Sequence, residues 1–366
     1  MKHKRIIAAL LSASMLLGLM LMVPLVHAEE SVSLSDTASP VAMEMPKSSE
    51  NVTFTGKEWT GQTVDGVQNE DVFAVNREAA SSFATSSVIY DSISGAITGA
   101  RDFKKDESKY VQFLTGNDQA NQNWELTVLA SAKDSGYAGY KDFYKTDYTK
   151  CANLASDKSR GYGEWKTGLT LPTSWEYDGF DYSIYTNADV PWQSGDRGSG
   201  FAPQVPEEAT PVGLYRKTFT VSDGLKRANG RIYLNFQGVE AAYYVYLNGK
   251  AVGYSEDTYS PHSFDVTDYL IEGENLLAVE VHKFCDGTWF ELQDMFKDGG
   301  IFRDVYLYAA PAVHLEDYKV ETDLDATYTD ATVKLNVTVR NNSSAAQNGW
   351  KVVAQLYDAD QKQIST

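Results

Sequence analysis

Apolar and polar residues alternate along much of the second half of the chain, with the period of two that is typical of β-strands. In 232–237, 277–282 and 333–340 every second residue is a large apolar one, so each segment would have one apolar face. No long stretch has the period of an amphipathic helix. The pattern therefore predicts half-buried antiparallel strands.

Turn signals separate these predicted strands. Asn248-Gly249 lies between the strand-like segments 242–247 and 250–254, and Asn-Gly is the preferred pair for a two-residue type I′ hairpin. The segment 267–270 is expected to form one short turn of helix before the chain reverses. Strands closed by such turns between residues 213 and 309 predict an all-β jelly-roll sandwich.

A second domain is expected to begin after Pro311. The segments 313–321, 331–340 and 351–357 have strand patterns. An immunoglobulin-like β-sandwich needs about 100 residues and roughly seven strands, more than 312–366 supplies. We therefore expect an incomplete immunoglobulin-like sandwich that stops before the domain is finished.

The region that precedes the clear strands has weaker patterns. Segments 109–114 and 124–129 look like strands, 76–80 is compatible with a helix, and 136–148 is rich in Tyr without a clear period. We expect these segments to pack onto the jelly roll as leading strands and an insertion. The jelly-roll domain with this N-terminal extension would then cover 59–311.

The N-terminal residues 1–28 have the composition of a secretory signal peptide. A basic start precedes an apolar run at 6–26, and cleavage is predicted after Ala28, which makes the protein secreted or cell-surface. An uncleaved anchor is the alternative, because about 20 apolar residues can span a bilayer. Residues 29–58 are rich in Ser, Glu, Thr and Pro and are expected to form a disordered tether.

The charge of the chain excludes two classes of partner. There are 50 acidic and 32 basic residues, which gives a formal net charge of −18. Nucleic acid and anionic lipid are bound by clustered Lys and Arg, so we expect no nucleic-acid partner and, beyond export, no membrane partner.

The number and spacing of the cysteines and histidines give little sign of a disulfide-bonded or zinc-binding fold. The sequence leaves open whether Cys151 and Cys285 form a disulfide. His262, His282 and His314 lie far apart in the chain and without cysteine companions, so no zinc site is expected.

A series of short motifs resembles bacterial β-galactosidases of glycoside hydrolase family 2. The resemblance covers about 59–366 and is strongest from 171 to 311. Each motif alone is a weak signal, but many in the same order are specific. The matching segments are 171–175 (Leu-Pro-Thr-Ser-Trp), 179–181, 184–187 (Ile-Tyr-Thr-Asn), 203–206, 213–216, 248–250, 252–254, 264–265, 273–275, 286–287, 293–295 (Gln-Asp-Met) and 300–305.

This resemblance implies a domain order and an activity. Family members have a jelly-roll domain, an immunoglobulin-like domain and a catalytic (β/α)₈ barrel that carries two catalytic glutamates. A barrel needs about 250 residues, and none of it is expected in this chain. The resemblance implies a β-galactosidase, a glycosidase that hydrolyses terminal β-D-galactosides with retention, and it implies that this chain alone is inactive and holds no catalytic residue.

Two residues match positions of the galactose subsite in this family. Asn187 matches a residue that hydrogen-bonds substrate hydroxyls, and Asp294 matches one that accepts from galactose hydroxyls and binds a monovalent cation. The resemblance thus implies Na⁺ or K⁺ at Asp294, since a hard cation prefers carboxylate and sugar oxygens. Mg²⁺ is expected only in the missing barrel.

Other nearby residues are weaker candidates. Glu291 is a tempting carboxylate partner for Asp294, but the family pattern implies no catalytic role for either. Asp286-Gly287 is expected to form a turn, and Arg303-Asp304 is expected to be structural. Family members usually have Trp where this chain has Phe296, which leaves the substrate open. Aromatic residues that could stack on a sugar are Trp192 and Trp289, although Trp in a β-sandwich is more often core.

Two other functions remain open. The chain could be a non-catalytic carbohydrate-binding module with a jelly-roll fold, which should have its own sugar-binding face. It could also come from a β-glucuronidase or β-mannosidase, which share the domain order, although the Ile-Tyr-Thr-Asn and Gln-Asp-Met segments favour a galactosidase. The natural galactoside is open, and an oligomer is possible for the full-length enzyme.

Overall fold

The computed structural model describes residues 20–22, 63–64, 67–68, 110–131, 133, 137–151, 158–187, 189–192, 205–227, 230–358 and 362–365. The predicted tether 29–58 and the helix-compatible segment 76–80 lie outside these residues, as does the predicted signal peptide apart from 20–22. Three short N-terminal strands are present: β1 (Met20–Met22), which pairs with β20 (Val352–Ala354), and β2 (Thr63–Val64), which pairs with β3 (Val67–Gln68).

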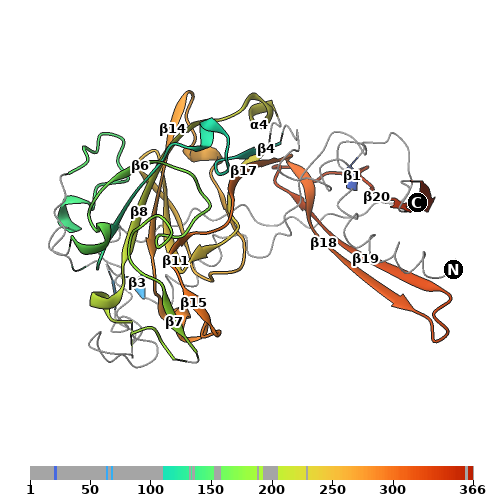
Figure 1. Ribbon diagram of the computed structural model, residues 1–366. Coiled ribbons are helices and arrows are strands. Elements are labelled where there is room, and N and C mark those ends of the chain that lie inside the picture. The colour runs from blue at the N-terminus through green and yellow to red at the C-terminus, as the bar shows by residue number, and fades with distance from the viewer. Residues whose placement is uncertain are drawn as a thin grey trace.

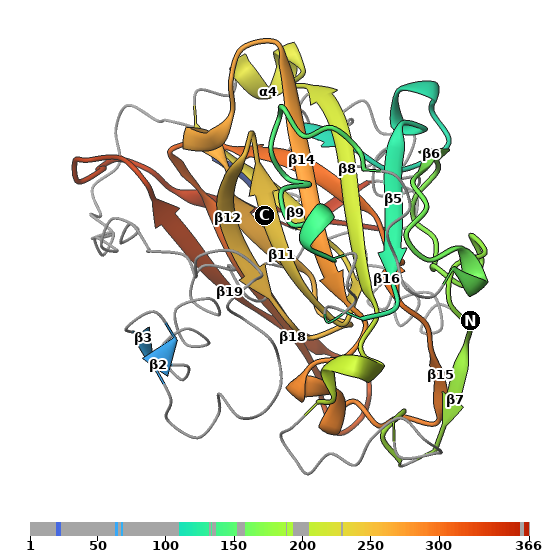
Figure 2. The ribbon, with the colours of Figure 1, turned by 90° about the vertical axis from the view of Figure 1, so that its left-hand side faces the viewer.

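Two antiparallel sheets form the body of the molecule (Figures 1 and 2). The larger sheet has the order β12 (Lys250–Ser255), β11 (Ala242–Leu247), β14 (Glu274–His282), β8 (Val212–Thr220), β5 (Trp124–Leu129) and β6 (Lys166–Leu169). The smaller sheet has the order β13 (His262–Asp265), β9 (Arg231–Phe236), β17 (Val305–Ala310) and β4 (Val111–Phe113). Among the described residues the one α-helix is the short α4 (Asp223–Arg227), so the predicted all-β sandwich is confirmed, and no helix there is long and apolar enough to cross a membrane.

The main hydrophobic core lies between the two sheets. Ile232, Leu234 and Phe236 of β9 all join it, and β14 contributes Leu277, Val279 and Val281. The alternation read from the sequence is therefore confirmed for the inward face of both strands. The predicted strand 124–129 coincides with β5, and its Trp124 and Leu126 are fully buried in the same core.

The prediction that these strands are only half buried is wrong for β14. The face opposite the main core carries Ala278, Glu280 and His282, and these are buried as well. The reason is a second hydrophobic cluster on the outer face of the large sheet, where Tyr140 and Phe143 of the Tyr-rich segment cover the strands. That segment has no strand or helix period because it lies across the sheet as turns and a short 3₁₀ helix.

The predicted turns form as expected. Asn248 and Gly249 have φ angles of 53° and 78°, the two positive values that a type I′ hairpin requires between β11 and β12. The predicted helical turn is the 3₁₀ helix Thr267–Tyr269.

One tryptophan is clamped between two glycines. Trp175 is fully buried, and its indole N–H donates to the Tyr215 hydroxyl at 2.6 Å. A Cβ atom at Gly213 would lie 2.3 Å from Cζ2 of this ring, and a Cβ atom at Gly299 would lie 2.4 Å from Cε3. Both positions must therefore lack a side chain for the ring to fit.

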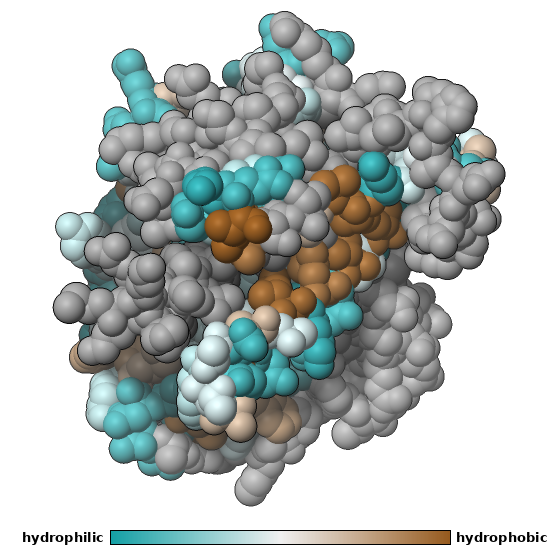
Figure 3. Space-filling model, turned by 90° about the vertical axis from the view of Figure 1, so that its right-hand side faces the viewer, coloured by the Kyte–Doolittle hydropathy of each residue, from teal (hydrophilic) through white to brown (hydrophobic). Residues whose placement is uncertain are grey.

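A long hairpin follows the sandwich and extends away from it (Figure 1). It consists of β18 (Val313–Leu324) and β19 (Ala331–Asn341), and β21 (Leu356–Tyr357) pairs with β22 (Gln363–Ser365) further on. These strands bear out the strand patterns predicted after Pro311, although the side chains of β19 are only partly buried. Figure 3, in which the right-hand side of Figure 1 faces the viewer, shows an apolar band with hydrophilic residues beside part of it.

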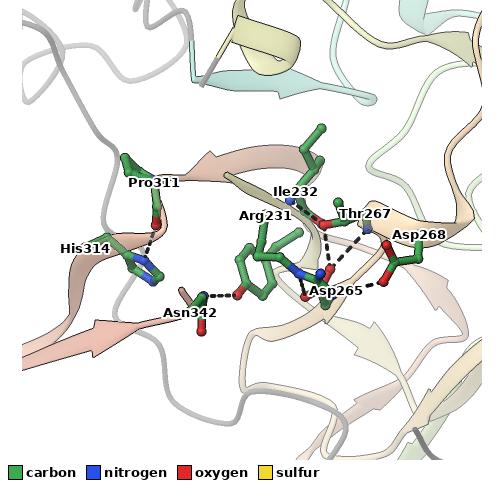
Figure 4. Close-up of polar contacts among 9 residues, drawn as sticks. Arg231, Ile232, Asp265, Thr267, Asp268, Pro311, His314 and Asn342 are labelled. Atoms are coloured by element: carbon green, nitrogen blue, oxygen red, sulfur yellow. Dashed lines mark hydrogen bonds and ion pairs between the residues drawn. The ribbon is translucent and has the colours of Figure 1, made fainter. Parts of the chain in front are cut away.

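The junction between sandwich and hairpin is polar (Figure 4). Asn342 donates to the Tyr233 hydroxyl at 3.2 Å, and Nδ1 of His314 lies 2.7 Å from the Pro311 carbonyl oxygen. Beside it, Arg231 forms an ion pair with Asp265 at 2.5 Å, which connects β9 to the end of β13. The base of the hairpin thus has polar contacts at both ends, from His314 in β18 and from Asn342, the residue after β19.

The clamp around Trp175 predicts a strong effect of a very small change. Gly213→Ala should lower the free energy of unfolding by about 1–3 kcal/mol, because the added methyl group overpacks the core. Thr220→Ala on the exposed end of the same strand is the matched control and should change it by less than about 0.5 kcal/mol. Urea denaturation of the two variants measures both values, and equal effects would contradict the clamp.

Candidate functional site

Two short strands form a separate ribbon at the end of the sandwich opposite α4 (Figure 2). They are β7 (Ile184–Thr186) and β15 (Met295–Lys297), and they pair antiparallel with Thr186 opposite Met295. Asn187 directly follows Thr186 and Asp294 directly precedes Met295, so both residues lie at the same end of the ribbon. The fold thus brings the two predicted subsite residues, 107 positions apart in the chain, to one end of this ribbon.

Three side chains share one face of this ribbon. Tyr185 and Phe296 are directly opposite each other in the ladder, so their side chains lie on the same face. Asp294 joins them, because the Tyr185 hydroxyl donates to its Oδ1 while the Tyr185 ring packs edge-on against Phe296. All three residues are exposed, as is Asn187 at the same end of the ribbon. The face therefore offers a carboxylate beside two aromatic rings, with an amide at its end.

Hydrogen bonds from buried residues hold the loop that leads into β15. Lys297 is 2% exposed, and its ammonium group donates to the carbonyl oxygens of Glu291 at 2.7 Å and Gln293 at 3.3 Å. The Glu291 carboxylate in turn accepts from the backbone N–H and the hydroxyl of Thr258, at 2.9 and 2.6 Å. Burial lowers the pKa of Lys297 and raises that of Glu291. Glu291 is therefore an anchor for the loop, and its carboxylate is bound to Thr258 while Asp294 contacts Tyr185.

The two tryptophans considered for sugar stacking differ in burial. Trp192 is fully buried in a small cluster with Phe284, so this indole ring is not accessible to a sugar. Trp289 is half-buried and packs against Trp192 with ring centroids 5.4 Å apart. Trp192 is therefore ruled out as an exposed stacking surface.

Two further expectations are met. Asp286 begins a short 3₁₀ helix, Asp286–Trp289, so Asp286-Gly287 is a turn. Arg303 donates to the carbonyl oxygens of Gln237 and Tyr259, and Asp304 accepts from the Thr115 hydroxyl at 2.9 Å. Arg303 and Asp304 are thus structural, as expected.

A buried acidic cluster was not anticipated from the sequence. One ligand atom from each of Glu256, Cys285 and Asp286 lies within 4.8 Å of the others, and all three residues are buried. Burial and the neighbouring Glu256 raise the pKa of Asp286 to about 8, and burial raises that of Cys285 well above its usual range. Two carboxylates and a thiol at this spacing could hold a cation such as zinc. The cluster joins two loops 29 positions apart, which no local pattern reveals.

Cys285 is not bonded to the other cysteine. Both Cys151 and Cys285 are free thiols, and the Cys151 sulfur lies 3.4 Å from the Tyr148 hydroxyl.

Comparisons with known proteins find relatives of this region. Residues 158–311 match the family described as "Glycosyl hydrolases family 2, sugar binding domain". A β-galactosidase of Priestia megaterium is 33% identical over 296 residues, which cover 81% of this chain and 25% of the relative, and one of Clostridium acetobutylicum is 34% identical over 281 residues, which cover 77% and 27%. A solved β-glycosidase from Bacteroides vulgatus is 23% identical, with a TM-score of 0.39 over 61% of this chain and 24% of that one. The chain spans about a quarter of the length of the curated relatives it matches.

The buried cluster predicts how stability depends on pH. The folded-state pKa of Asp286, about 8, lies above the ordinary value of 3.8, so the native state retains a proton that the unfolded chain releases. The stability that this proton provides is complete below about pH 4 and is lost as the pH rises through about 8. Asp286→Asn should therefore reduce the fall in Tm between about pH 5 and pH 9, by about 2–4 °C for each kcal/mol of ionisation cost removed.

Calorimetry over this pH range tests the prediction. Asp189→Asn, at an exposed site, is the control and should keep the wild-type fall in Tm. Part of the fall should remain in Asp286→Asn, because burial also raises the pKa of Glu240 to about 8. The same fall in both variants would mean that Asp286 is not protonated in the native state.

Proposed function

We propose that this chain, whose residues 158–311 match the sugar-binding domain of glycosyl hydrolase family 2, is the carbohydrate-recognising N-terminal part of a secreted β-galactosidase-like enzyme. The complete enzyme would hydrolyse terminal β-D-galactosides. The support for this substrate is that the curated relatives at 33–34% identity carry the name β-galactosidase. Export is supported by the signal-peptide composition of 1–28.

The observation that carries the proposal is the register of the β7–β15 ribbon. It brings Asn187 and Asp294 to the same end of the ribbon, where both are exposed, which supports a role for the amide and the carboxylate in hydrogen-bonding the hydroxyls of one sugar. The hydrogen bond from Tyr185 is the one that Asp294 makes to the described part of the chain, so acceptor capacity remains for a galactosyl hydroxyl and for Na⁺ or K⁺.

The hydrolytic chemistry would come from a separate barrel domain. A retaining glycosidase needs two carboxyl groups about 5 Å apart that reach the substrate. Glu256 and Asp286 approach this spacing, but they are only 7% and 6% exposed, so no sugar can lie between them. We propose that the catalytic glutamates and any Mg²⁺ belong to the barrel and that this chain by itself is inactive.

A non-catalytic carbohydrate-binding module is the second candidate. The exposed polar and aromatic face of the ribbon is the feature that favours it, since such a face could bind a sugar without a further domain. The affinity of the isolated chain separates the two functions, because a partial subsite should bind more weakly than a complete one.

A sugar titration tests the proposed subsite. Methyl β-D-galactoside added to the purified chain should shift backbone amide signals of the ribbon in NMR spectra, with a Kd weaker than about 1 mM, equivalent to less than about 4 kcal/mol. Asn187→Ala and Asp294→Asn should each weaken binding about 3–10-fold, because each removes a hydrogen bond to the sugar. Asp189→Asn, two residues beyond Asn187, is the control and should leave the Kd unchanged.

Three outcomes would count against the proposal. A Kd well below about 1 mM would favour the binding module. Unaltered binding in both site variants would remove Asn187 and Asp294 from the subsite. Release of nitrophenol from a nitrophenyl β-galactoside by the purified chain would contradict its inactivity.

A further inference from the structure

Tyr185 touches the proposed subsite residue directly. Its hydroxyl donates to Oδ1 of Asp294, although both side chains lie on the exposed face of the ribbon. Asp294 lies two residues from Phe296, the residue directly opposite Tyr185, so this is a diagonal cross-strand contact. Diagonal neighbours in a ladder are close enough for a long side chain such as tyrosine to bridge them.

The Tyr185 ring is itself held in place. Phe296 faces it across the ribbon with ring centroids 5.7 Å apart and planes at 64°, an edge-to-face arrangement. The two rings are 58% and 59% exposed, so neither is fixed by a surrounding core. The ring pair and the hydroxyl contact thus form one unit that ends at the Asp294 carboxylate.

An exposed carboxylate normally moves among several rotamers, and this freedom is lost when it binds a ligand. A hydrogen bond that a phenol donates to a charged carboxylate is stronger than one between neutral groups. Oδ1 is therefore occupied and oriented before any ligand arrives, and Oδ2 has a defined position. Preorganisation of this kind lowers the entropic cost of binding.

We infer that Tyr185 is a positioning residue for Asp294: its hydroxyl fixes the carboxylate for the sugar hydroxyl and the monovalent cation, and Phe296 braces the Tyr185 ring. The inference rests on the proposed function of Asp294. In this role Tyr185 does not contact the sugar, and its hydroxyl group, rather than its ring, affects sugar binding.

The first experiment tests the contact without any sugar. In the full chain with ¹³C-labelled tyrosine, Asp294→Ala should shift the ring signals of Tyr185 at a fixed pH, because it removes the acceptor of the Tyr185 hydroxyl. Asp189→Asn is the matched control and should leave these signals in place. Unchanged Tyr185 signals in Asp294→Ala would overturn the inference.

The second experiment tests whether Tyr185 acts through Asp294. The Kd for methyl β-D-galactoside is measured by NMR in NaCl and in a salt of a bulky organic cation, for Tyr185→Phe, Asp294→Asn and the double variant. Tyr185→Phe, which keeps the ring, should weaken binding about 3–10-fold and reduce the dependence on Na⁺. In a chain that already carries Asp294→Asn, Tyr185→Phe should not weaken binding further, because the effects of coupled residues on the binding free energy do not add.

The outcomes separate this inference from the proposed function. If Asp294→Asn leaves the Kd unchanged, the proposed function fails, and the positioning role fails with it. If Asp294→Asn weakens binding but Tyr185→Phe does not, or if the two effects simply add, the function stands and the inference is overturned. A Phe296→Leu variant that weakens binding while Tyr185→Phe does not would mean that the rings stack on the sugar, which also overturns it.

Discussion

The antiparallel ladder between β8 and β14 is the constraint on which the rest of the structure depends. These two nine-residue strands lie in the middle of the large sheet and bury side chains on both faces. Their inner face packs against the smaller sheet, and their outer face is covered by the Tyr-rich segment 137–148. Because both faces of these strands are buried, a shift in their register would bury polar groups. The β8–β14 ladder therefore fixes the positions of the elements that pack against it.

The ribbon of the proposed subsite is attached to this frame through buried polar contacts. Lys283 follows β14 directly, is fully buried, and forms ion pairs of 2.6 Å with Glu176 and Asp181. The Tyr215 hydroxyl in β8 accepts from the Trp175 indole at 2.6 Å. Both contacts hold the stretch of chain that leads into β7. An exposed site of two three-residue strands can therefore have a defined geometry, because its supports lie in the core.

The features of the fold that could be predicted from the sequence are those set by residues close together in the chain. The strand 124–129, the inward side chains of 232–237 and the hairpin at Asn248 depend on neighbouring residues and were predicted correctly. The double burial of β14 was missed, because its cover comes from a segment with no period of its own. The pairing of β7 with β15 was not predicted, since three-residue strands carry no measurable alternation and the two strands lie far apart in the chain. Asn187 and Asp294 are candidates by resemblance alone. The Glu256–Cys285–Asp286 cluster gave no signal, because its members meet only in the folded chain.

The packing of Trp175 between two glycines limits how related sequences can diverge. Positions 213 and 299 are 86 residues apart, yet each touches an opposite part of the same indole. Neither glycine can be exchanged alone, and a smaller residue at 175 would leave a cavity that both positions could then fill. Residues 175, 213 and 299 should therefore change together in evolution. Related proteins that keep the tryptophan should keep both glycines. Larger residues at 213 or 299 should occur in relatives that have lost the tryptophan.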